Sequence, residues 1–156
     1  RYALHSPEKV DRLFLVSPAG APMSGDGFRH LRQIFDLRSA ADGRAFLKRL
    51  FHRRPWYSIF LGGQVRRLLG RPLVQSFLKE TSNQDSLDSA QSAALKPKTL
   101  LLWGRSERIL PAECLAWYRE NLPPDTTIEE PEGYGHSPHL EIPDDLSRRV
   151  LEFARG

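Results

Sequence analysis

Cysteine is almost absent from this sequence. Cys114 is the single cysteine, so no disulfide can form within the chain, and no Cys-x-x-Cys or Cys/His cluster with metal-ligand spacing occurs. We therefore expect no metal site and no cofactor. Because disulfides persist mainly in oxidising compartments, we expect a cytoplasmic location.

Long apolar runs are also missing. No stretch approaches the roughly 18 to 20 apolar residues that a helix needs to span a bilayer, and the N-terminus lacks the pattern of a signal peptide. Methionine is equally scarce, because the chain begins at Arg1 and its one methionine is Met23. We predict that the chain is part of a longer protein or a processed product.

The composition is otherwise that of a globular protein, with 40% hydrophobic and 27% charged residues among 156. This length predicts one domain with its own core. The net charge of +4 is unevenly placed: residues 26–80 hold twelve Lys or Arg and four acids, whereas the rest of the chain has a net charge of −4. The middle of the chain is therefore predicted to be a separate unit with a basic surface.

Strand and helix signals alternate at both ends of the chain. Short apolar runs predict buried strands at residues 12–17 and 98–104, and Thr126–Glu130 is β-prone and more polar. Helices are expected at residues 111–121 and from residue 143 onward, the first opened by a proline. Residues 25–95 have helical spacing with basic faces instead. Alternating strands and helices predict an α/β fold with a parallel sheet.

Three segments resemble the α/β-hydrolase family. Residues 2–20 include PEKVDRLFLVSPAG and resemble its sixth-strand segment, residues 100–111 (LLLWGRSERILP) its seventh strand and acid loop, and residues 135–143 (GHSPHLEIP) its histidine loop. The resemblance implies the C-terminal part of such a fold, with parallel strands, flanking helices and an inserted helical cap. It implies core segments at 1–22 and 96–156, a cap at 23–95, and a missing N-terminal half of the core.

In this resemblance Glu107 is the catalytic acid and His136 the general base. Each residue follows a predicted strand, and one helix separates the two strands, so both side chains should meet at the carboxyl edge of the sheet. An acid there can bind one imidazole nitrogen while the other serves a nucleophile. The alternatives are that Glu107 forms a surface ion pair with Arg105 or Arg108, and that His136 is only structural.

The nucleophile is expected to be absent from this chain. A Gly-x-Ser-x-Gly turn needs a strand before the serine and small residues around it. Ser137 has the first glycine but lacks the second, and Ser24 fits no better. The family implies a nucleophile upstream of Arg1, so the chain alone is predicted to be inactive, and its expected partner is the missing N-terminal part, in the same or a companion chain.

The predicted cap offers hints about the substrate. Residues 54–74 loosely resemble the cap of abhydrolase-domain lipases and deacylases that act on phospholipids, a branch whose histidine loop often carries an aspartate where this chain has Glu141. Trp56 and Phe60 are candidates for lining an acyl pocket. Large apolar and basic residues also alternate as in interfacial helices, so contact with a membrane surface and a merely solvated face both remain open. Nucleic acid binding is not expected.

These observations predict a hydrolase of carboxylic esters or lipid acyl groups. Two alternatives share the fold. An aspartate nucleophile would give an epoxide hydrolase or a dehalogenase, and a fold without any nucleophile would be a non-catalytic lipid-binding protein.

Overall fold

The computed structural model describes all residues from 1 to 156. The core elements before the long insertion are a short helix, a 3-10 turn and a strand: α1 (Tyr2–His5), η1 (Pro7–Lys9) and β1 (Arg12–Val16). The insertion follows as α2 (Gly25–Phe35), α3 (Ala40–Leu50), η2 (Trp56–Phe60), α4 (Gly62–Leu69), α5 (Pro72–Glu80), η3 (Asn83–Asp85) and α6 (Ser89–Ala93). The chain then returns as β2 (Lys98–Leu102), α7 (Ala112–Asn121), β3 (Thr127–Glu129), α8 (Pro138–Glu141) and α9 (Pro143–Arg155).

The three strands form one parallel sheet in the order β1-β2-β3. Arg12 pairs with Lys98 at one end of the first ladder, and Leu102 pairs with Glu129 at the end of the second. The parallel α/β fold predicted from the sequence is confirmed. All three strands therefore point their carboxyl ends to the same edge, where the loops after β2 and β3 emerge.

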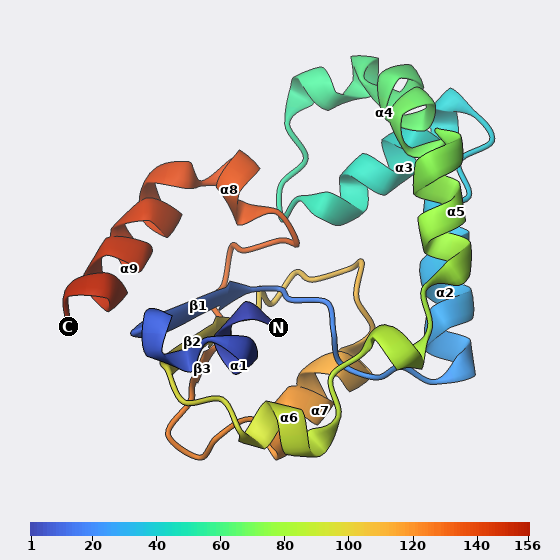
Figure 1. The fold of residues 1–156 in the computed structure, drawn as a ribbon. Helices are drawn as coiled ribbons and strands as arrows, with labels where there is room; N and C mark the ends of the chain where they lie inside the picture. The colour runs from blue at the N-terminus through green and yellow to red at the C-terminus, as the bar shows by residue number, and fades with distance from the viewer.

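The central strand β2 holds the two core layers together because its side chains alternate between the faces of the sheet. Leu101 packs with Cys114, Leu115 and Tyr118 of α7 on one face. Leu102 packs on the other face with Tyr134, and Leu146 and Phe153 of α9 cover that cluster. Figure 1 shows α7 and α9 on opposite sides of the strands.

The first strand is less buried than its apolar sequence predicted. Every residue of β1 is only half-buried, whereas Thr99 to Leu102 of β2 are buried. The reason is position, since β1 lies at an edge of the sheet with β2 as its one strand neighbour.

Four of the helices between β1 and β2 form a separate group, which we call the inserted helices: α2 to α5, with η2 (Figure 1). Their own small core contains Ile34 and Phe46 and is closed by Ile109 from the loop after β2. Helix α6 lies instead beside α7, below the sheet. None of the helices combines the length and the hydropathy needed to cross a membrane.

Local signals explain where the inserted helices begin. Ser24 caps α2 by accepting from the Gly27 amide at 3.0 Å, and Ser39 with Asp42 forms a capping box at α3. Helices α3 and α4 cross closely at two glycines. A Cβ on Gly43 would lie 2.0 Å from the carbonyl oxygen of Gly62, so only glycine permits this crossing.

Candidate active site

Glu107 lies in the loop that follows β2, and its carboxylate is buried. The side chain is 3% exposed. One carboxylate oxygen, Oε1, accepts hydrogen bonds from the backbone amides of Ile109 at 2.8 Å and Leu110 at 3.1 Å. The neighbouring cations are engaged elsewhere: Arg105 pairs with Glu132 and Arg108 donates to the Lys48 carbonyl oxygen. The alternative of a surface ion pair for Glu107 is therefore wrong.

His136 lies in the loop after β3, next to the loop of Glu107. Its Nδ1 lies 2.8 Å from Oε2 of Glu107, so the structure brings these two predicted residues together. The His136 side chain is 26% exposed. A buried carboxylate thus holds one ring nitrogen of a partly exposed imidazole, the arrangement that fixes a histidine in one tautomer.

The surroundings of Glu107 keep its carboxyl ionised. Burial by itself raises its pKa, but the hydrogen bond and charge of His136 and the Ile109 amide oppose it, and the net effect lowers the pKa below its ordinary value of 4.5. Glu107 is therefore a carboxylate at neutral pH and accepts the Nδ1–H of His136.

An apolar cavity of about 410 Å³ adjoins His136. Eleven of its 18 lining residues are hydrophobic, which suits an uncharged apolar ligand group. The other ring nitrogen of His136, Nε2, makes no hydrogen bond with the protein, and the imidazole contributes to the cavity wall. One ring nitrogen of His136 is therefore free to bond with a group that occupies the cavity.

The cavity is lined mainly by residues that the sequence did not single out. Phe28, Leu31 and Phe77 come from α2 and α5, and Ile109 and Cys114 come from the core side. The sequence did carry a signal for Phe28, Leu31 and Phe77, because apolar residues at helical spacing form a stripe that is normally covered by other residues. The sequence could not tell a cavity from a filled core.

Trp56 and Phe60 are not among the lining residues of this cavity. Trp56 is 77% exposed and Phe60 is 68% exposed, both on η2 at the outer edge of the inserted helices. The structure therefore does not bring these two predicted pocket residues to His136. Their helical spacing was real, but η2 packs through Ser58, which is buried.

Neither serine considered as a nucleophile forms a hydrogen bond from its hydroxyl to the His136 ring. The Ser24 hydroxyl donates to Glu113 at 3.0 Å and accepts the Gly27 amide as a helix cap. Ser137 is buried at the start of α8, and no strand directly precedes it, as a nucleophile turn would require. The contacts of both serines indicate structural roles instead.

A joint that the sequence did not predict attaches the inserted helices to the histidine loop. The carboxylate of Glu141 accepts from the backbone amides of His52 at 2.8 Å and Arg53 at 2.6 Å. The Ser137 amide donates to the Leu50 carbonyl oxygen at 3.1 Å. We call these contacts the 50–53 joint.

Two further features strengthen this joint. His52 Nδ1 lies 2.7 Å from the hydroxyl oxygen of Ser106, the residue before Glu107. A Cβ on Gly135 would lie 2.6 Å from both the His52 nitrogen and the Leu50 carbonyl oxygen, so a glycine is needed beside His136. The joint therefore contacts both loops of the Glu107–His136 pair.

Ser17, at the end of β1, is a strained residue near the site. Its φ angle of 38° lies in the left-handed region, which is unfavourable for a residue with a side chain. Ser17 is buried, and its hydroxyl oxygen has no hydrogen-bond partner. The Ser17 side chain is nonetheless near enough to the Glu107 carboxyl to make a small contribution to the lowered pKa of that group. Strain of this kind gathers at functional sites.

No group of three or more His, Cys, Asp or Glu side chains is arranged to hold a metal ion. The chemistry that this site can perform without other groups is proton transfer at His136, with Glu107 stabilising the imidazolium.

No protein-family model matches the sequence. Solved structures do resemble this one. The 2-hydroxy-6-oxo-6-phenylhexa-2,4-dienoate hydrolase of Rhodococcus sp. strain RHA1 superposes with a TM-score of 0.76 at 19% identity, over 99% of this chain and 58% of that protein. A bacterial membrane phospholipase A gives 0.76 at 23% identity, over 99% and 52%. A naproxen esterase of Bacillus subtilis gives 0.66 at 18% identity, over 97% and 54%.

These similarities establish the fold. The chain has the α/β-hydrolase fold, as the three sequence segments predicted, and it spans 58% of the length of the first of these hydrolases. A share of this size is consistent with the C-terminal portion of the fold.

Proposed function

We propose that this chain supplies the acid and the base of a serine hydrolase that cleaves carboxylic esters, including lipid acyl esters. The observation that carries the proposal is the 2.8 Å contact between Glu107 and His136 beside an apolar cavity. A buried carboxylate on one imidazole nitrogen, with the other nitrogen free, is the arrangement of a general base.

The proposed reaction has two stages. A serine hydroxyl attacks the ester carbonyl while Nε2 of His136 takes its proton, and the same nitrogen then returns that proton to the leaving alcohol. Water repeats the sequence on the acyl-enzyme and restores the serine. Through both stages Glu107 accepts the Nδ1–H of His136 and stabilises the imidazolium by its charge.

In this proposal the serine lies outside the 156 residues. Neither Ser24 nor Ser137 forms a hydrogen bond from its hydroxyl to the His136 ring, and the chain spans little more than half of each hydrolase described above. We therefore expect the isolated chain to be inactive, and its principal partner to be the remaining part of the same fold, in the same or a companion chain.

The apolar cavity supports an acyl substrate. Its hydrophobic walls would exclude water from the acyl group and leave the ester carbonyl near His136. The proposed class is therefore an ester with an apolar acyl group.

A fluorophosphonate probe on the full-length protein tests the serine mechanism, because it labels an activated serine covalently. We expect labelling, and we expect Glu107→Gln to lower kcat about 10²- to 10⁴-fold, as loss of a triad acid does elsewhere. The matched control is Glu152→Gln, an exposed carboxylate on α9, which should stay within about twofold of wild type.

Other outcomes would replace the proposal. Turnover of epoxides or haloalkanes without labelling indicates an aspartate nucleophile. Lipid binding with neither labelling nor turnover indicates a non-catalytic protein. Activity of Glu107→Gln within about threefold of wild type removes Glu107 from the mechanism.

A further inference from the structure

The outer edge of the inserted helices exposes large apolar side chains close together in the chain. Trp56 and Phe60 are the most exposed of them, and the others on η2 and α4 are Tyr57, Ile59 and Leu68. Five large hydrophobic residues on one 3-10 turn and the helix that follows it are more than the scattered apolar residues of an ordinary surface. We call this group, with the arginines described next, the outer surface.

The segment that carries these apolar residues is also basic. Residues 53–77 contain no Asp or Glu and five arginines: Arg53, Arg54, Arg66, Arg67 and Arg71. All five are exposed, and none forms an ion pair with a carboxylate. On α9, by contrast, Arg148 and Arg149 pair with Asp145. The positive charge of the outer surface is therefore not neutralised within the protein.

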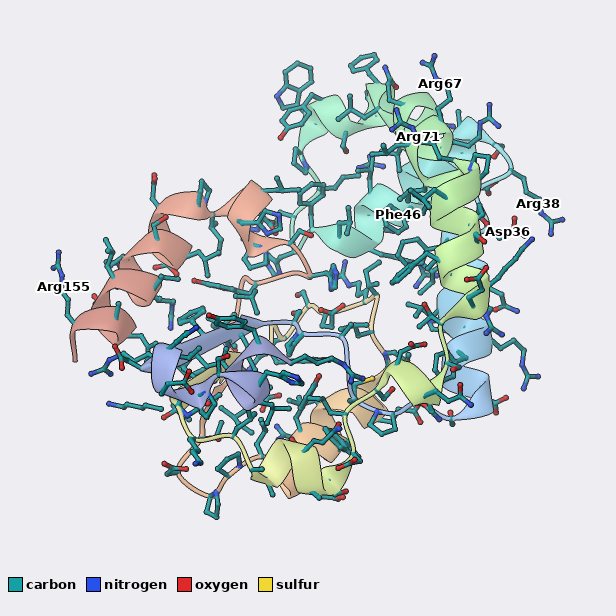
Figure 2. All side chains as sticks on the ribbon, viewed as in Figure 1. Asp36, Arg38, Phe46, Arg67, Arg71 and Arg155 are labelled. Carbon is teal, nitrogen blue, oxygen red and sulfur yellow. The ribbon has the colours of Figure 1, made fainter.

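The outer surface faces away from the sheet. Figure 1 shows α4 at the edge of the molecule farthest from the strands. Arg67 projects outward at this end in Figure 2, whereas Arg155 projects from the opposite side of the molecule. Nothing within the chain covers these residues.

The apolar exposure extends toward the cavity along α5. Phe77 is 69% exposed and also lines the cavity beside His136. Leu73 lies one helical turn before Phe77 and is exposed as well. Exposed apolar side chains of α5 therefore extend as far as the cavity wall.

We propose that the outer surface docks on an anionic lipid bilayer. Trp and Tyr are the residues enriched at the boundary between headgroups and acyl chains, because their rings are apolar and carry a polar group. Arginine places its apolar stem in that boundary and its guanidinium at the lipid phosphates. The absence of any acid over residues 53–77 favours an anionic occupant and opposes a second copy, whose arginines would repel these.

This proposal is independent of the hydrolase function, because vesicle binding is measured without turnover. Sedimentation with vesicles of phosphatidylcholine alone, or mixed equally with phosphatidylglycerol, gives the affinity. We expect the protein to bind the mixed vesicles, to bind neutral vesicles at least tenfold more weakly, and to be released by salt as surface charges are screened. Emission of Trp56 should shift to shorter wavelength on binding, and Trp56→Phe should remove that shift.

Two variants and two matched controls locate the contact. Arg66→Gln with Arg67→Gln should weaken binding about 25-fold, since each arginine near an anionic surface contributes about fivefold. Trp56→Ala with Phe60→Ala should weaken it at least tenfold. The controls are Tyr2→Ala with Leu151→Ala, and Lys9→Gln with Arg155→Gln, which remove exposed apolar or basic groups elsewhere.

The controls should stay within about twofold of wild type, and circular dichroism should be unchanged in all four variants. Three results overturn the proposal. The first is absence of binding to anionic vesicles, and the second is equal weakening in variants and controls. The third is a dimer in solution that the Trp56→Ala, Phe60→Ala variant dissociates, since a second copy would then occupy this surface.

Discussion

The carboxylate of Glu107 has both oxygens engaged, one with His136 and the other with the amides of Ile109 and Leu110. Such a group orients the histidine and also contributes to the stability of the fold. Its lowered pKa links the two roles, because a carboxyl that prefers to be ionised in the folded state makes folding depend on pH.

We predict the sign of this dependence. Glu107 has a folded-state pKa below its ordinary value of 4.5, so its contribution is complete above that pH and is lost as pH falls through the lower, folded value. Glu107→Gln should therefore lower the free energy of unfolding at pH 7 by about 1–3 kcal/mol, and the loss should shrink in acid. Urea unfolding at pH 7 and pH 3 measures this, and an unchanged difference between the two would contradict it.

Cys114 gives a second prediction at this scale. Burial, with smaller contributions from the charges of Glu113 and Glu107, raises the pKa of its thiol to about 11. At pH 8 only about one thiol in 1,000 is then ionised, although Cys114 lines the cavity. Iodoacetamide should label the native protein at least about 100-fold more slowly than the urea-unfolded protein, as mass spectrometry can follow. Complete labelling of the native protein within minutes would exclude the raised pKa.

Helices and loops depend on a few contacts at their crossings. The 50–53 joint fixes the end of α3 against the loop of His136 through the Glu141 carboxylate. The joint also contacts Ser106, the residue before Glu107. A movement of the inserted helices should therefore shift both the Glu107 loop and the His136 loop.

We predict that Glu141→Ala opens this joint. The amides of His52 and Arg53 lose their acceptor, so their hydrogen exchange should become at least about tenfold faster, while the β2 amides should change less. Glu141→Gln retains one carbonyl acceptor and should give an intermediate rate. Glu120→Ala, at an exposed position on α7, is the control and should leave both amides protected. Unchanged exchange in Glu141→Ala would show that other contacts hold the joint.

The crossing of α3 and α4 gives a matched pair of glycine variants. Gly43→Ala would place a Cβ 2.0 Å from a backbone oxygen, so the helices must separate, at about 1–3 kcal/mol. At Gly63 a Cβ meets nothing within 4 Å, and alanine favours the helix by up to about 1 kcal/mol. Thermal unfolding should therefore show Gly43→Ala destabilised and Gly63→Ala neutral or stabilised. Equal changes in melting temperature for the two variants would mean that helix propensity, and not the close contact at Gly43, sets the stability of both.

For the whole molecule, the sequence predicted the elements with strong periodicity. The buried run of β2, the polar β3 and the order of strands and helices could be predicted because each depends on local pattern. The contact of Glu107 with His136 could be predicted because parallel strands bring their carboxyl ends together. The partial exposure of β1 could not, since it depends on which strands lie beside it.

The surroundings of the inserted helices were beyond sequence reasoning. Trp56 and Phe60 have the same spacing whether they line a pocket or face outward, and only the packing of Ser58 decides between these. The link from Glu141 to His52 joins residues 89 positions apart, and no local pattern indicates it.

The pairing of β1 with β2 has one further consequence. These strands are adjacent and in direct register, yet residues 17–97 lie between them in the chain. The entropic cost of a longer connection between fixed ends is small, because each doubling of its length adds only about 0.6 kcal/mol. The sheet can therefore accommodate connections of very different length between β1 and β2. Over evolution the inserted helices could be exchanged as a module, provided that the 50–53 joint is kept. Grafting another module that keeps these contacts should alter what reaches His136 while leaving its pairing with Glu107 intact.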